Sequence, residues 1–170
     1  MRQALLALAF AAMACLPALA EADVLVVVVR HAEKATDDPR DPGLAARGHA
    51  RAAALAAALA GSLPDVAYAT QFKRTQQTAA PAALAAGITV TVRPVQGDSA
   101  AADATNLARE LRALPAGSVA LVVGHSNTVP GIVAALDGRP ETAMPETEYD
   151  RFTTLRLRAD GGTDTVVTRY

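Results

Sequence analysis

The chain has 170 residues, with 16 Lys and Arg against 17 Asp and Glu, and a formal net charge of −1 at pH 7. This near-neutral charge and an aromatic content of 4% argue against nucleic-acid binding, which needs a basic stripe or stacking aromatic side chains. After the N-terminal segment, no stretch approaches the roughly 20 apolar residues that a membrane-spanning helix requires.

The first twenty residues have the pattern of a secretory signal peptide. A basic Arg2 precedes an apolar run over residues 4–16, and Ala18-Leu19-Ala20 forms a small-residue cleavage site. We therefore expect residues 1–20 to be a signal peptide and residues 21–170 to form one exported domain, periplasmic or secreted. The single cysteine, Cys15, would be removed with the signal, leaving no disulfide and no cysteine-ligated zinc. Lipid attachment at Cys15 is the less favoured alternative, because the leucine usual three residues earlier is absent.

Apolar runs of strand length alternate with helical patterns along the rest of the chain. In chain order we expect a strand at 24–29, a helix at 44–60, a strand at 65–70, a helix at 73–86, a strand at 88–92, a helix at 100–114, a strand at 118–124 and a helix at about 128–136. Alternating apolar and polar residues on either side of Gly161-Gly162 predict a C-terminal edge hairpin. The expected fold is α/β, a three-layer sandwich with a mostly parallel central sheet and helices on both faces.

Clusters of charged side chains lie at the carboxyl ends of three of the predicted strands. Arg30 and His31 follow the first strand in VLVVVVRHAEK, Arg74 follows the second in QFKRTQQTA, and His125 follows the fourth in GHSNTVP. Because the carboxyl ends of parallel strands lie at one edge of a sheet, these side chains are expected to converge. Guanidinium groups match the geometry of phosphate oxygens, and imidazole can act as a nucleophile or a donor. The pattern therefore predicts an anion site.

The order RHAEK, KRTQQTA and GHSNTVP, after an export signal, resembles the histidine phosphatase superfamily, with its phosphoglycerate mutase-like fold, in the small-domain branch. The resemblance implies that His31 is the phosphorylated nucleophile, that Arg30 and Arg74 clamp the phosphoryl group, and that His125 completes the pocket. It also implies that no metal or other cofactor is needed. Ala32 stands where the family commonly has glycine, so the backbone there should be ordinary or mildly strained.

The chemistry of phosphoryl transfer agrees with these roles. Two guanidinium groups, together with free amides at the start of the helix after Ser126-Asn127, can neutralise the charge on three equatorial oxygens without a cation. His31 must keep one ring nitrogen bare and bond the other, which we expect to meet a backbone carbonyl. Water then hydrolyses the phosphohistidine. We expect an exported, metal-independent phosphatase for small phosphomonoesters; a mutase is less favoured, because the chain leaves little room for insertions that would enclose an intermediate.

A carboxylate protonates the leaving oxygen in many small-branch members, and it lies between the second motif and the last. This region offers Asp98 and Asp103 in QGDSAAD, with no glutamate before Glu110. We favour Asp98 as the general acid, because it is nearer the end of the predicted third strand.

Two other functions are compatible with parts of the sequence. GHSNT is similar to the G-x-S-x-G elbow of serine hydrolases, which would make Ser126 the nucleophile. Thr128 replaces the last glycine, however, and no histidine follows Ser126 to serve as the base. A non-catalytic module that binds phosphorylated ligands would use the same clamp, and detection of a phosphoenzyme distinguishes the two.

Two further features are assigned no chemical role. His49 lies among arginines in a predicted helix and is expected to be solvated. The acidic stretch TDDPRDPG does not have the spacing of a calcium-binding loop, so we expect a solvated turn at the rim of the pocket.

Overall fold

The computed structural model describes residues 23–96 and 99–170. The predicted signal peptide, Cys15 and Asp98 lie outside the described residues. The strands are β1 (Val24–Arg30), β2 (Val66–Ala69), β3 (Val90–Val92), β4 (Val119–Gly124), β5 (Arg151–Leu157) and β6 (Thr163–Arg169). The helices are α1 (Ala46–Ala58), α2 (Lys73–Ala86), α3 (Ala100–Arg112) and α4 (Val129–Asp137).

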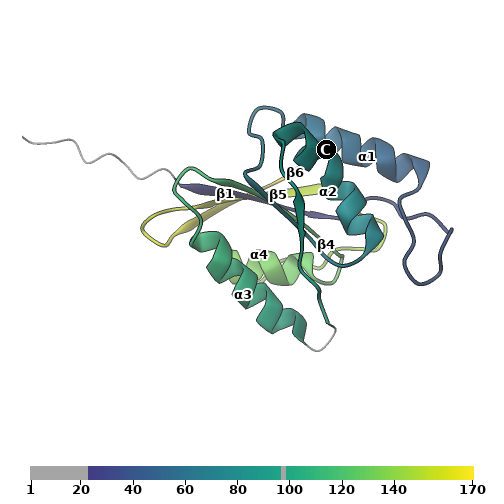
Figure 1. Ribbon diagram of the computed structural model, residues 1–170. Helices are drawn as coiled ribbons and strands as arrows, with labels where there is room; N and C mark the ends of the chain where they lie inside the picture. Colours follow the sequence, from purple (N-terminus) through teal and green to yellow (C-terminus); the bar gives the residue numbers. More distant parts are fainter. Residues whose placement is uncertain (1–22, 97–98) are drawn as a thin grey trace, which may run out of the picture.

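The strands form one six-stranded sheet in the order β3-β2-β4-β1-β5-β6. β1 pairs in parallel with β4, and β2 pairs in parallel with β4 and β3. The hairpin of β5 and β6 adds to β1 in the antiparallel direction, with β6 at the edge. Helices α1 and α2 cover one face of the sheet, and α3 and α4 cover the other (Figure 1). The predicted fold class is confirmed.

The central strand β1 is apolar from Val24 to Val29, and both of its faces are buried. Val26 and Val28 belong to the core under α3 and α4, whereas Val27 and Val29 pack with residues of α1 and α2. All four valines are at most 2% exposed. Burial on both faces fixes β1 at the centre of the sheet, and this places the residues that follow it at the middle of one sheet edge.

Helix α1 packs closely against the segment that follows β1. A Cβ added to Gly48 would lie 2.2 Å from the backbone oxygen of Glu33, so only glycine fits here without displacement. The amide of Ala45 donates a hydrogen bond of 2.9 Å to the same oxygen. The contact anchors the chain just beyond His31 against a helix.

Two of the predicted elements begin two residues later in the structure than the sequence indicates. The predicted helix at 44–60 begins at Ala46, because Leu44 forms a bridge with Lys34 instead. The predicted strand at 88–92 begins at Val90, because the amide of Ile88 bonds to Ala83 and completes the end of α2 around Gly87, which has φ of 69°. Within residues 23–96 and 99–170, none of the helices has the length and apolar character needed to cross a membrane.

Candidate active site

The carboxyl ends of the two central strands bring both predicted catalytic histidines together. Arg30 at the end of β1 lies opposite Gly124 at the end of β4, and the amide of His31 donates a 2.9 Å hydrogen bond to the Gly124 oxygen. His31 and His125 follow these strand ends, and their ring centroids are 5.2 Å apart in an edge-to-face arrangement. Residues 94 positions apart in the chain thus share one site because β1 and β4 are neighbours.

His31 is held with one ring nitrogen bonded and the other bare. Its Nδ1 lies 2.7 Å from the backbone oxygen of Ala32, and because a carbonyl only accepts, Nδ1 carries the proton and donates it. Nε2 is then the unprotonated nitrogen with a free lone pair. Burial, together with the positive charges of Arg74 and Arg30, lowers the pKa of His31 to about 4. The imidazole is therefore neutral at pH 7, as a nucleophile must be.

Ala32 adopts an ordinary backbone conformation, since positive φ among the described residues is restricted to glycines. Its amide donates a 2.9 Å hydrogen bond to the hydroxyl of Thr78 on α2. Alanine in place of the family's usual glycine therefore causes no strain at this position.

His125 is held by two threonines. Its Nε2 lies 2.9 Å from the hydroxyl oxygen of Thr70, and its amide donates a 2.9 Å hydrogen bond to the hydroxyl of Thr128. Burial lowers the pKa of His125 to about 3, and the nearby His31, Arg74 and Arg30 act in the same direction. Like His31, His125 is neutral at pH 7.

Arg30 is buried, and a single loop engages most of its donors. Nη1 donates to the backbone oxygens of Pro145, Glu146 and Glu148 at 2.8–3.0 Å, and Nη2 donates to the Glu146 carboxylate at 2.9 Å. The ring of Tyr149 lies 4.1 Å from the guanidinium carbon. A guanidinium has five N–H donors, and Nε remains buried without a partner among the described residues.

Arg74 lies in the first turn of α2, where its guanidinium carbon is 4.4 Å from the centre of the Phe72 ring. Its Nη1 is 3.9 Å from the Asp41 carboxylate, and its Nε is buried with no partner in the described part of the chain. Burial lowers the pKa of Arg74, and the charge of Arg30 lowers it further. Two positive groups are thus held close to each other and to two neutral imidazoles.

The start of α4 differs from the expectation of free amides after Ser126-Asn127. The amides of Thr128 and Val129 both donate to the backbone oxygen of His125, at 3.1 and 2.9 Å. These two donors hold the turn that positions His125, and they are not available to a bound anion.

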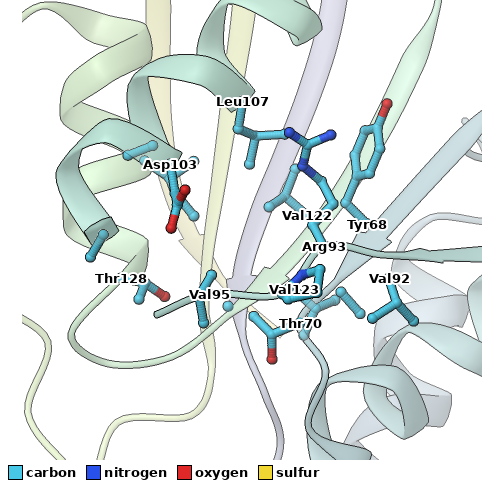
Figure 2. A pocket seen from close by; sticks show the side chains of 16 residues that line it. Tyr68, Thr70, Val92, Arg93, Val95, Asp103, Leu107, Val122, Val123 and Thr128 are labelled. Atoms are coloured by element: carbon cyan, nitrogen blue, oxygen red, sulfur yellow. The ribbon is translucent and has the colours of Figure 1, made fainter. Parts of the chain in front are cut away.

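The carboxylates of Glu33 and Asp103 are each bonded to groups other than the predicted site residues. Glu33 is engaged by Arg51 and Arg47 at 2.8–3.0 Å. Asp103, on α3, accepts a 2.6 Å hydrogen bond from Ser99. It lines a cavity of about 280 Å³ that Thr70 and Thr128 also line (Figure 2). His49 is exposed on α1, as expected.

Sequence reasoning missed the loop after α4, which contributes Glu146 and Tyr149. The hydroxyl of Ser126 donates to one oxygen of the Glu146 carboxylate, and Arg30 binds the other. Ser126 bonds to no histidine in the described ranges, so the pair that a serine hydrolase needs is not formed. The stretch MPETEYD has neither periodicity nor a strand end, and it carried no signal that placed it beside residues from β1.

A sequence profile of the histidine phosphatase superfamily (branch 1) matches residues 26–95, which contain Arg30, His31 and Arg74. The matched segment of the chain is thus similar to the histidine phosphatase superfamily (branch 1). The match and the geometry described above support a phosphatase. A comparison with curated proteins gave no significant match.

Solved structures of phosphatases share the fold. A SixA protein of Nakamurella multipartitia, described as a candidate phosphohistidine phosphatase, is 24% identical, with 88% of this chain and 98% of that chain covered and a TM-score of 0.61. The protein histidine phosphatase SixA in complex with tungstate is 18% identical, with coverages of 85% and 96% and a TM-score of 0.62. A mycobacterial glucosyl-3-phosphoglycerate phosphatase in complex with VO3 is 17% identical, with coverages of 85% and 98% and a TM-score of 0.66.

Proposed function

We propose that this histidine phosphatase hydrolyses small phosphomonoesters through a covalent phosphohistidine on His31. One observation carries the proposal. The Nε donors of Arg30 and Arg74 are both buried without a partner among the described residues, beside a neutral imidazole whose Nε2 is bare. Buried guanidinium donors are costly unless something pairs with them, and a phosphoryl group supplies the acceptors.

In the first step, the lone pair of His31 Nε2 attacks phosphorus. A P–N bond forms, the bond from phosphorus to the ester oxygen breaks, and that oxygen leaves as the alcohol after it takes a proton. Arg30 and Arg74 neutralise the charge on the equatorial oxygens. The bond from Nδ1–H to the Ala32 oxygen stabilises the positive charge that develops on the ring. His125, neutral and bonded to Thr70, completes the wall of the pocket.

In the second step, water attacks the phosphohistidine, the P–N bond breaks, and inorganic phosphate leaves. His31 regains its lone pair at Nε2. The tungstate and VO3 complexes of two structurally similar phosphatases support a pocket of this fold that accepts oxyanions.

Two finer parts of the proposal rest on the sequence. Export rests on the signal-like residues 1–20, with lipid attachment at Cys15 as the alternative. Metal independence rests on the two arginines, which supply the positive charge that a cation would otherwise supply.

The covalent intermediate separates an enzyme from a module that only binds phosphorylated ligands. With phosphorus-labelled substrate and a chelator present, rapid quenching of the wild type is expected to trap label that is stable in base and released by acid. His31→Ala should trap none and lose turnover, with its circular dichroism spectrum unchanged. Near-normal turnover by His31→Ala would reject the mechanism, and tight phosphate binding without turnover by the wild type would support the binding module.

A further inference from the structure

The Glu146 carboxylate bonds to Arg30, one of the two arginines proposed to bind the phosphoryl group. One of its oxygens accepts a 2.9 Å hydrogen bond from Nη2 of Arg30, and the other accepts a hydrogen bond from the hydroxyl of Ser126. The Arg30 side chain is 3% exposed, whereas the Glu146 side chain is 80% exposed. The carboxylate therefore lies at the boundary between the buried clamp and solvent, at the mouth of the site.

The other described carboxylates near the site are committed elsewhere. Glu33 is held by two arginines of α1, and Asp103 is bonded to Ser99. Asp41 accepts a 2.9 Å hydrogen bond from the amide of Lys73 at the start of α2 and is 3.9 Å from Arg74. Of these three carboxylates and Glu146, only Glu146 bonds to the guanidinium of Arg30, the residue before His31.

The direction of phosphoryl transfer determines which side of the site the leaving oxygen occupies. In-line attack by His31 puts the leaving oxygen on the side of phosphorus opposite Nε2. His31 is 4% exposed, so its ring forms the floor of the site, and the leaving group must point toward the mouth. The leaving oxygen is thus directed to the side where the Glu146 carboxylate lies.

We propose that Glu146 is the catalytic acid that protonates the leaving oxygen, an inference that rests on the phosphatase mechanism proposed above. As the P–O bond breaks, the protonated carboxyl of Glu146 gives its proton to the ester oxygen, and the alcohol departs. In the second step the resulting carboxylate takes a proton from the attacking water, and phosphate leaves. Glu146 ends the cycle protonated, and all atoms and charges balance.

The charged and titratable groups that face Glu146 are Arg30, His31 and His125. In the free protein the bond from Ser126 lowers the pKa of Glu146, and the charge and hydrogen bond of Arg30 act in the same direction. A bound phosphate dianion competes for Arg30 and brings negative charge beside the carboxylate. Both changes favour the protonated form, so substrate binding itself prepares the acid.

Dependence on the leaving group provides the test. In a two-step reaction through a phosphoenzyme, kcat/KM reports only the steps up to alcohol release, and an acid matters most for a poor leaving group. Glu146→Gln keeps the size of the side chain and one acceptor oxygen for Arg30, and its amide can donate to the Ser126 hydroxyl, but it cannot give a proton to the leaving oxygen. We expect kcat/KM for an alkyl phosphate to fall by about 10²-fold, the low end of the usual contribution of general acid catalysis, with p-nitrophenyl phosphate nearly spared.

Two matched variants serve as controls. Glu148→Gln makes the same change in the same loop, but that carboxylate binds Arg151 and Arg169, so any loss should be equal for both substrates. Asp98→Asn tests the acid favoured from the sequence. A selective loss of alkyl phosphate hydrolysis in Glu146→Gln but not in Asp98→Asn supports the proposal. A selective loss in Asp98→Asn alone, an equal loss for both substrates in Glu146→Gln, or no loss in it would overturn the proposal.

These outcomes are independent of the proposed function. If the wild type forms no phosphoenzyme, the phosphatase mechanism fails before any variant is compared. If the wild type forms a phosphoenzyme and Glu146→Gln is unselective, the mechanism stands and only the assignment of Glu146 fails.

Discussion

The Nε–H group of Arg74 can serve an anion as a hydrogen-bond donor, in addition to the positive charge of the guanidinium. Its Nε is buried without a partner in the described ranges, while Nη1 lies 3.9 Å from Asp41. Lysine keeps the positive charge but has no donor at the Nε position and no planar pair of donors. Arg74 therefore contributes geometry that a lysine cannot supply.

Arg74→Lys should accordingly lower kcat/KM for any phosphomonoester by about 10²-fold, comparable with the loss of one donor to a transition-state oxyanion. Steady-state kinetics on two substrates of different leaving-group quality measures the effect, and the loss should be the same for both. Arg109→Lys, at an exposed position of α3, is the matched control and should be silent. A fully active Arg74→Lys enzyme would show that the charge alone suffices.

The four residues of the predicted anion site could be found from the sequence because each follows a strand and because strand ends share an edge. The residues that complete the site could not be found in this way. Glu146 reaches Arg30 across 116 positions from a loop without periodicity, and Thr70 binds His125 through a hydroxyl that no pattern distinguishes. Asp98 stays a prediction. Side-chain contacts of loops depend on the finished packing, which periodicity does not encode.

At the level of elements, the predicted parallel strands agree with the structure to within two residues, and the late start of β3 at Val90 is the largest difference. The errors occur where a tertiary contact competes with local preference. Leu44 has the apolar character of the helix it precedes, yet it pairs with Lys34. Ile88 reads as a strand residue, yet its amide closes the end of α2. Local propensity is a weak guide at such junctions because one backbone hydrogen bond can decide them.

The packing of α1 on the segment after β1 leads to a prediction about Gly48. Gly48→Ala would put a methyl group 2.2 Å from the Glu33 oxygen, so the helix or the segment must move. We expect a loss of roughly 1–3 kcal/mol in the free energy of unfolding, as for other overpacked sites. Denaturant titration measures this loss.

Gly131→Ala is the matched control, because an added Cβ on this residue of α4 meets nothing within 4 Å. This variant should be more stable than the wild type by roughly 0.5–1 kcal/mol, since alanine restricts the unfolded chain and suits a helix interior. Equal effects of the two substitutions on the free energy of unfolding would mean that α1 and the segment at Glu33 can move apart without loss of stability.

For the whole molecule, the two buried histidines link stability to pH. Burial lowers the pKa of His31 to about 4 and that of His125 to about 3, compared with 6.5 for a free histidine. Below pH 6.5 the unfolded chain takes up protons that the folded protein does not bind. The histidines' contribution to stability is therefore complete above pH 6.5 and is lost as the pH falls toward 4.

The free energy of unfolding is expected to decrease by on the order of 2 kcal/mol between pH 6.5 and 5, a range above that in which most carboxylates titrate. Chemical denaturation at a series of pH values measures this slope. His125→Gln should remove about half of it, whereas His49→Gln, at an exposed position, should leave it unchanged. A slope that His125→Gln does not alter would assign the pH dependence to other groups.

The bonds of Arg30 also determine when the site can exist. His31 and Arg30 are translated early, but the three backbone oxygens that hold the Arg30 guanidinium belong to residues 115 to 118 positions later. A growing chain therefore contains His31 for most of its synthesis before the loop that holds Arg30 has been made. The site can be complete only after the loop that follows α4 has been synthesised and β5 has paired with β1. Activity is therefore expected only at the last stage of folding.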